Sequence, residues 1–354
     1  MSPDPASASV EAFLRREIEE GSFPGGAALV ASGDAILDQA VAGAACVDPE
    51  YEAADAETLY DLASLTKPLA AAALTRAAGP ALPLDAAPGR FLPEWKKTRF
   101  DGITVASLLT HTSGLAAWFP LYSRGEGAAS YRRTLAELEP EMAPGAAVVY
   151  SDLNFLLLAQ LLESVLSSSL DRAFEELVAL PAGSSARFLP EAPKRAAATE
   201  KGDLVERGMT ARLGLSYAGF RDWVVRGDVH DGNAFRRGGV SANAGLFGTA
   251  PDVWRLARTW LDLGGAGYTA DHTPAHPESR GLAWQRKRGA GSAIPEMSDD
   301  SFGHTGFTGT SVWVDPRRDR IAVLLTNRIH PAAPDANFHE VRKRFHQMVW
   351  GRET

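Results

Sequence analysis

The sequence lacks several features that tie a chain to particular classes of protein. Cys46 is the single cysteine among 354 residues, which excludes an internal disulfide framework and a cysteine-rich metal site. We interpret Cys46 as a buried or half-buried residue, because nothing around it suggests an activated thiol. No apolar run approaches the length of a membrane span, and residues 1–5 lack the basic and apolar segments of a secretory signal. We therefore expect no membrane segment and a cytoplasmic location, although a chain whose leader had been removed would look the same.

An excess of basic residues is also missing. The chain has 36 Lys and Arg against 44 Asp and Glu, a net charge of -8 and a pI near 5.6. This balance disfavours nucleic acid or an anionic membrane as the partner, while leaving room for a local basic patch. We expect a small-molecule partner, and the sequence leaves the oligomeric state open.

What is present is an ordinary globular composition with strands near both ends. The patterns predict a helix over 7–20, a hairpin of 25–31 with 35–41, a second hairpin of 309–314 with 320–326, and a last helix over 337–349. The middle reads as mostly helical, with buried or capped helices over 103–113, 154–167 and 249–263. We predict an α+β fold, with a sheet domain from 1–78 and 285–354 and a mostly helical domain from 79–284.

The stretch 61–70 carries the first chemical signal. Ser64 and Lys67 are three residues apart at the start of an alanine-rich helix, so both side chains lie on one face. A serine hydroxyl needs an adjacent base to become a nucleophile, and backbone N–H groups at a helix start can stabilise an oxyanion. Alone, the pair occurs often by chance as a capping serine and a solvated lysine.

Two further stretches gain meaning beside the first. Tyr150 precedes a buried helix, and a phenol beside a lysine ammonium can have a lowered pKa and move protons. His304, Thr305, Gly306 and Phe307 stand before the penultimate strand, where small residues admit an extended substrate and a backbone N–H can complete an oxyanion hole. Taken singly, Tyr150 reads equally as a loop anchor and the glycine-rich stretch as an ordinary strand entry.

In this order the elements resemble the serine β-lactamase and penicillin-binding protein superfamily, specifically its class C branch with related esterases and amidases. That pattern is Ser-x-x-Lys, then Tyr-x-Asn, then Lys-Thr-Gly or His-Thr-Gly. Here it reads Ser64 and Lys67, Tyr150 and Asp152, and His304 with the two residues after it. The resemblance covers about residues 10–350. It implies an antiparallel sheet flanked by helices, an inserted helical lobe and an active site between them.

The resemblance also implies roles. Ser64 would be the acylated nucleophile, and Lys67 and Tyr150 would share the base and acid steps, with the order of the two left open. The backbone N–H groups of Ser64 and Phe307 would bind the oxyanion. The family uses no metal and no cofactor, so we expect neither.

Two departures from the pattern bear on the substrate. Asp152 replaces the usual Asn, and a carboxylate near Lys67 would favour the ammonium form and shift the base role toward Tyr150. His304 replaces Lys and removes a permanent positive charge that could meet a substrate carboxylate. Both departures favour an esterase or amidase over an efficient β-lactamase.

The polar stretches 227–234 and 239–247 resemble a subgroup that includes cytoplasmic N-acetylmuramoyl-L-alanine amidases of peptidoglycan recycling. Asp231 and Asn233 could bind a sugar or peptide amide, or could equally form Asx turns within their own loops. The expected substrate is a small amide or ester, such as a MurNAc-L-Ala peptide. The alternatives are a class C-type β-lactamase, a general carboxylesterase, or a ligand sensor without turnover. The candidate substrate-binding residues are Asp152, His304, Thr305, Gly306, Asp231 and Asn233.

Other readings are excluded by the residues. We interpret His111 as structural, and Pro274 between His272 and His276 argues against a helical zinc pair. No Gly-x-Ser-x-Gly elbow of an α/β-hydrolase and no phosphate-binding glycine loop occurs.

Overall fold

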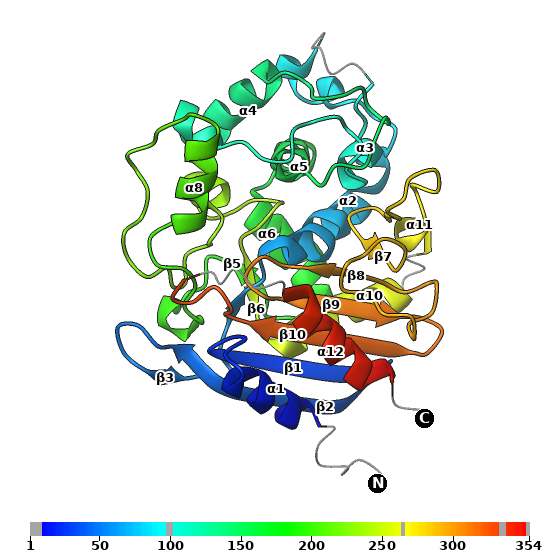
Figure 1. Cartoon of the computed structure of the whole chain (residues 1–354). Helices are drawn as coiled ribbons and strands as arrows, with labels where there is room; N and C mark the ends of the chain where they lie inside the picture. The colour runs from blue at the N-terminus through cyan, green and yellow to red at the C-terminus, as the bar shows by residue number, and fades with distance from the viewer. Residues whose placement is uncertain (1–8, 97–101, 263–265, 333–337, 352–354) are drawn as a thin grey trace.

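The computed structural model describes residues 9–96, 102–262, 266–332 and 338–351. An antiparallel sheet lies at one end of the molecule, and a mostly helical part stands beyond its edge and one face (Figure 1). The predicted α+β class is confirmed. In spatial order the strands are β3 (Glu52–Ala53), β2 (Ala35–Cys46), β1 (Gly25–Ser32), β10 (Arg320–Thr326), β9 (Ser311–Asp315), β8 (Phe302–Thr305) and β7 (Gln285–Arg286).

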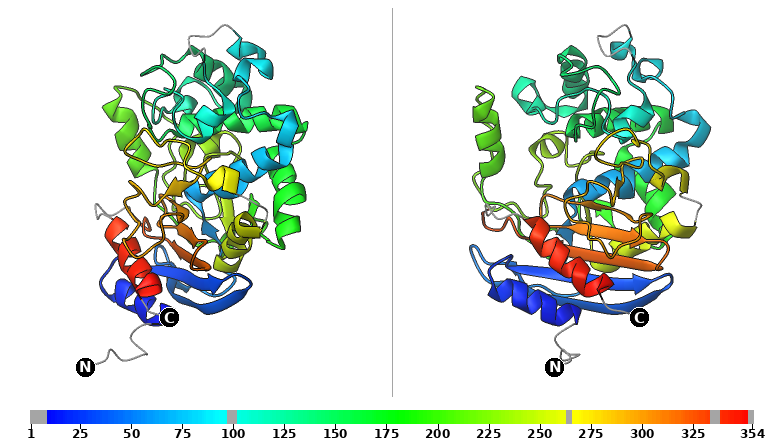
Figure 2. Two further views of the ribbon diagram at one scale, coloured as in Figure 1. Left: turned by 90° about the vertical axis from the view of Figure 1, so that its right-hand side faces the viewer. Right: turned by 45° about the vertical axis from the view of Figure 1, so that its right-hand side comes forward.

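Both faces of the sheet are covered. Successive strand residues point to opposite faces, so Leu29 of β1 joins one core while Ala28 and Val30 join the other. This explains why the central strands read as continuous apolar runs. Helices α1 (Val10–Glu19) and α12 (Phe338–Trp350) cover the face of Ala28 and Val30, as Figure 2 shows.

The opposite face of the sheet carries helix α10 (Ala250–Asp262), which contacts β1, β9 and β10. The predicted division into two domains stays a prediction. It assigns α10 to the helical part, however, whereas the helix packs on the sheet.

The helical part is built around α5 (Asp152–Leu166), whose side chains from Leu153 to Leu162 are all buried. Burial on nearly all sides accounts for its apolar sequence. Among the described residues, no single helix is both long and apolar enough for a membrane span, although the bent pair Asp152–Leu166 and Leu170–Ala182 meets both criteria together. The remaining helices are α2 (Ala73–Ala78), α3 (Val105–Leu109), α4 (Gly127–Glu137), α6 (Leu170–Phe174), α7 (Leu180–Ala182), α8 (Leu204–Arg212), α9 (Gly232–Arg236) and α11 (Ala266–Thr269).

A second, smaller sheet holds the segment that leads to Ser64. It consists of β4 (Tyr60–Asp61), β6 (Leu246–Gly248) and β5 (Arg187–Phe188), in the order β4-β6-β5. These strands of two or three residues are too short to show a periodic pattern, and none was predicted. The predicted hairpins and the helices α1, α3, α5, α10 and α12 are confirmed within a few residues. Of the predicted helices, residues 7, 8, 263 and 337 lie outside the described residues.

Candidate active site

Ser64 lies in a 3₁₀ turn (Ala63–Leu65) directly after β4, and a π-helical turn (Lys67–Ala72) leads on into α2. The expected helix is therefore present, but it does not start as a regular α-helix. Ala63 has φ +47°, a strained value for a residue with a side chain, immediately before Ser64. The buried Asp61 carboxylate holds this turn, because it accepts the N–H of Ala63 at 2.8 Å and the N–H of His230 at 2.7 Å.

Lys67 is fully buried, makes two hydrogen bonds and forms an ion pair with Asp152. Its Nζ donates to Ser64 Oγ at 2.9 Å and to the Asn243 carbonyl at 3.0 Å, and it lies 2.6 Å from Asp152 Oδ1. Burial acts against the charged form, but Asp152 and Tyr150 outweigh it and raise the pKa of Lys67. The ammonium form predicted from Asp152 is thereby supported, and Lys67 acts on Ser64 as a donor.

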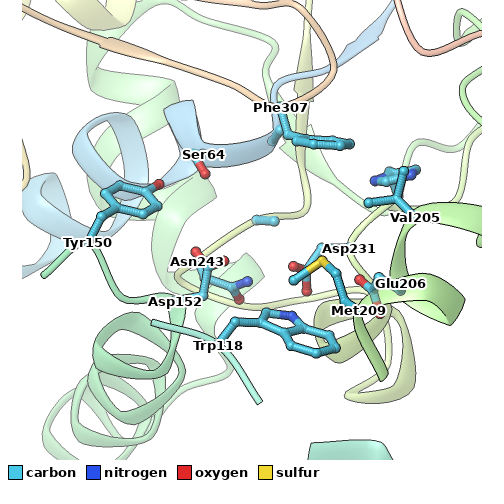
Figure 3. A pocket seen from close by; sticks show the side chains of 13 residues that line it. Ser64, Trp118, Tyr150, Asp152, Val205, Glu206, Met209, Asp231, Asn243 and Phe307 are labelled. Atoms are coloured by element: carbon cyan, nitrogen blue, oxygen red, sulfur yellow. The ribbon is translucent and has the colours of Figure 1, made fainter. Parts of the chain in front are cut away.

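Tyr150 lies beside this pair, and its hydroxyl faces Ser64 (Figure 3). Lys67 Nζ is 5.0 Å from the centre of the tyrosine ring. The pKa of Tyr150 is raised, because burial outweighs the lowering by the Lys67 charge and by hydrogen bonds with Lys67 and Ser64. The expectation of a lowered pKa is therefore wrong for the resting site, where the phenol keeps its proton.

The His304 stretch reaches the site from β8. Its imidazole is buried 6.0 Å from the Tyr150 ring, and Nδ1 lies 2.9 Å from the Thr305 carbonyl. Gly306 donates to the Thr310 carbonyl and accepts from Arg342, so its backbone serves the turn after β8. Phe307 is 42% exposed and stacks on His230 at the mouth of the pocket.

A pocket of about 230 Å³ opens beside Ser64 (Figure 3). Its charged lining is acidic, with Asp152, Glu206 and Asp231 and with no lysine or arginine among the lining residues described. His230, which also lines it, lies 2.8 Å from the buried Glu200. The lining residues are Ala63, Ser64, Trp118, Tyr150, Asp152, Val205, Glu206, Met209, His230, Asp231, Asn243, Ala244 and Phe307.

Of the two candidate residues in the 227–234 stretch, one lines the pocket and the other does not. Asp231 lines the pocket and also caps α9, accepting the Ala234 N–H at 2.7 Å. Asn233 is buried outside the lining, where its amide accepts from the Leu121 N–H and donates to the Phe119 carbonyl. We withdraw Asn233 as a substrate contact, because both ends of its amide already hold the 119–121 loop.

Glu206 is an acidic residue that the sequence reading missed. Its carboxylate accepts from the Tyr122 hydroxyl at 2.7 Å and from the Gly232 N–H at 2.6 Å. Burial and the nearby Asp231 raise the pKa of Glu206 to about 7. This end of the pocket therefore gains negative charge near neutral pH, and it favours groups that donate hydrogen bonds.

Other parts of the site were missed because no local pattern marks them. The Asn243 carbonyl that binds Lys67 is 176 residues away from it in sequence. Trp118 reaches the pocket from a loop, and Met209 reaches it from helix α8. The density of small polar residues around Asn243 was the one available signal. His111, predicted to be structural, accepts the Ser151 N–H at 3.0 Å and packs 4.5 Å from the Tyr150 ring. Within the described residues, no group of three His, Cys, Asp or Glu side chains is placed to hold a metal ion.

Comparison with known proteins adds to this geometry. The family model described as Beta-lactamase matches residues 10–344. A putative D-alanyl-D-alanine carboxypeptidase of Escherichia coli K12 is 31% identical, over 78% of this chain and 71% of that protein. An N-acetylmuramyl-L-alanine amidase of Bacillus subtilis 168 is 28% identical, over 92% of this chain and 82% of that protein.

Solved structures give the same fold at lower identity. EstCE1, described as a hydrolase with promiscuous acyltransferase activity, matches with a TM-score of 0.74 at 21% identity over 98% of both chains. A class C beta lactamase from Rhodobacter sphaeroides matches with a TM-score of 0.69 at 19% identity, over 97% of this chain and 98% of that one. At these identities the likeness concerns the fold alone.

Proposed function

The chain belongs to the beta-lactamase family of serine hydrolases, and from that premise we propose that it cleaves a small amide or ester through an acyl-enzyme on Ser64. One observation carries the proposal: Lys67, which is ion-paired with Asp152, donates to Ser64 Oγ while the Tyr150 hydroxyl faces the same oxygen. The positive charge of Lys67 and the proton-carrying hydroxyl of Tyr150 therefore both lie beside the nucleophilic oxygen of Ser64.

The proposed first step uses Tyr150 as the base. Lys67 is held as an ammonium by Asp152, so it has no lone pair with which to take a proton. Tyr150 first releases its phenolic proton to solvent, and the phenolate then takes the Ser64 Oγ proton as Oγ bonds to the substrate carbonyl carbon. The bond from that carbon to the leaving nitrogen or oxygen then breaks, and Tyr150 returns its proton to the leaving group.

The second step removes the acyl group. Water attacks the ester carbonyl of the acyl-enzyme and gives one proton to Tyr150, which passes it to Ser64 Oγ as the ester bond breaks. In both steps we assign stabilisation of the oxyanion to the backbone N–H groups of Ser64 and Phe307, which flank the pocket. The strained Ala63 and the Asp61 carboxylate support this role, since they fix the backbone that presents Ser64.

For the substrate we propose a peptidoglycan fragment of the MurNAc-L-Ala type. Trp118 offers an aromatic surface for a sugar ring, and the acceptors Asp231 and Glu206 suit sugar hydroxyl groups. The amidase relative, which covers 92% of the chain, supports the same class.

The test is a parallel incubation with MurNAc-L-Ala, a D-Ala-D-Ala peptide, nitrocefin and p-nitrophenyl butyrate. We expect the highest kcat/KM on MurNAc-L-Ala and a loss of at least about 10³-fold in Ser64→Ala. Faster turnover of nitrocefin, the D-Ala-D-Ala peptide or the butyrate ester would replace the proposed substrate by that class. Stoichiometric labelling of Ser64 by a fluorophosphonate, without turnover of any substrate, would identify a ligand sensor instead.

A further inference from the structure

Position 304, in the third motif of the site, is a histidine where a lysine would bring a positive charge. A carbonyl can only accept, so the contact of His304 Nδ1 with the Thr305 carbonyl places the imidazole proton on Nδ1. Burial, followed by the Arg280 charge, holds the pKa of His304 well below its ordinary range. His304 is therefore neutral at physiological pH.

A buried arginine lies where that charge is missing. Arg280 is on the segment before β7, which pairs with β8 through Gln285 and Gly303. An isolated bridge joins Arg280 to Gln285 and so brings it alongside the strand of His304. The guanidinium carbon is 5.5 Å from the centre of the Tyr150 ring, and the side chain is 3% exposed.

The charge of this guanidinium is only partly balanced. Nη2 pairs with Glu278 Oε1 at 2.5 Å, and the Glu278 side chain is 32% exposed, so water screens it. Nε and Nη1 of Arg280 are buried and have no hydrogen-bond partner among the described residues. Buried charges are ordinarily paired on all sides, so an arginine left in this state calls for a functional explanation.

We propose that Arg280 is a positioning residue of the catalytic centre, whose guanidinium supplies beside Tyr150 the fixed positive charge that His304 does not carry. The inference rests on the proposed role of Tyr150 as the base. In this proposal Arg280, from a neighbouring segment, provides the positive charge that a lysine at position 304 would provide.

The other charged and titratable groups around Tyr150 sharpen the argument. Lys67 and Asp152 face it from the Ser64 side and act in opposite directions on its pKa. His111 packs against the ring, and burial and Arg280 depress its pKa, as they depress that of His304. Lys67 is the strongest lowering influence, Asp152 acts against it and both imidazoles are neutral, so the guanidinium of Arg280, 5.5 Å from the ring centre, adds a second positive charge that favours the phenolate.

The test follows the pH dependence of Ser64 labelling by a fluorophosphonate, which needs no knowledge of the substrate. In Arg280→Met the acidic limb should move to higher pH by about one unit or more, while Arg280→Lys should keep it near its original position. Glu278→Gln removes the balancing carboxylate and should move the limb to lower pH. In Arg280→Met the added change His304→Lys should restore the limb, and Arg288→Met, a neighbouring exposed arginine, should leave it unmoved.

Opposite shifts in Arg280→Met and Glu278→Gln separate an electrostatic role from a structural one, because a structural defect would slow labelling without reversing sign. An unmoved limb in folded Arg280→Met, or shifts of both variants in one direction, would overturn the proposal.

NMR titration of the imidazoles is a second test, and it does not depend on activity. The pKa of His304 and of His111 should rise in Arg280→Met, and unchanged values would also overturn the proposal. Failure of the proposed function shows differently, as labelling or turnover that survives Ser64→Ala.

Discussion

At the scale of single residues, the site is organised by a lysine that cannot act as a base. Lys67 makes two hydrogen bonds and an ion pair, and the shortest of these contacts is with Asp152 at 2.6 Å. The ion pair fixes the amine near Ser64 at the expense of its basicity. In the proposed mechanism the proton moves through Tyr150, whose pKa reflects the balance of the charges around it.

Replacing Asp152 by Asn tests that balance. The Asp152 charge raises the pKa of Tyr150, so its removal lowers that pKa. Because the base must lose its proton before the reaction, the acidic limb of kcat/KM should move to lower pH, by about one unit. Glu163→Gln removes another carboxylate of α5, one that pairs with Arg237, and should leave the limb in place. An unmoved limb in Asp152→Asn would remove the proposed influence of this carboxylate.

At the scale of elements, the turn after β8 is clamped onto the turn that carries Ser64. Thr308 Oγ1 donates to the Asp61 carbonyl at 2.7 Å, and Thr310 Oγ1 donates to the Leu62 carbonyl at 3.0 Å. Gly306 lies inside this clamp. A Cβ on Gly306 would lie 2.0 Å from Thr310 Oγ1 and 2.7 Å from the Leu62 carbonyl oxygen.

Gly306→Ala should therefore separate the two turns and misplace Ser64 and the Phe307 N–H together. We expect kcat/KM to fall by about 10²-fold, because displacements near 1 Å have effects of that size in active sites. Gly208→Ala is the matched control, since a methyl group on this residue of α8 meets only the end of Arg212 at 3.8 Å. It should leave activity unchanged and stabilise the protein by about 0.5–1 kcal/mol. Full activity in Gly306→Ala would show that the clamp does not position the nucleophile.

The same elements show which parts of the site could be predicted from the sequence. Ser64 and Lys67 are close in sequence and share a helical face, so their contact follows from local geometry. Tyr150 and His304 could be placed beside them only because the order of the three motifs resembles a known family. Arg280 had no such signal, because the pairing of two-residue β7 with β8 brings it to the site and so short a strand shows no periodicity.

At the scale of the whole molecule, the two ends of the chain close one sheet. Strand β1 pairs with β10 in a register that places Gly26 opposite Thr326. Asn327, just after β10, accepts the Gly25 N–H and donates to the Ala44 carbonyl, so it joins three strands at once. The site depends on this closure, because β8 and β9 continue outward from β10 and carry the third element toward Ser64.

The first and last helices are joined by an ion pair that should contribute to this closure. Glu17 of α1 has a fully buried side chain and accepts from Arg344 of α12 at 2.8 and 2.6 Å, with a further hydrogen bond from Ser22. Burial acts to raise the pKa of Glu17, but the hydrogen bonds from Arg344 and Ser22 outweigh it and the pKa lies below its ordinary value. A lowered pKa means that this stabilisation is present above the unfolded-state pKa, near 4.5, and is lost as the pH falls through the folded-state pKa.

Arg344→Met should lower the free energy of unfolding at pH 7 by about 2 kcal/mol, because it leaves a buried carboxylate without its main partner. Urea unfolding at pH 7 and again below pH 4 measures this, and the difference between variant and wild type should shrink in acid as Glu17 takes up a proton. Arg15→Met is the matched control, since its pair with Glu11 is solvent-exposed on α1 and should contribute less than about 0.5 kcal/mol. Equal effects of the two variants, or a difference that does not shrink in acid, would show that the ends of the chain are held by apolar packing alone.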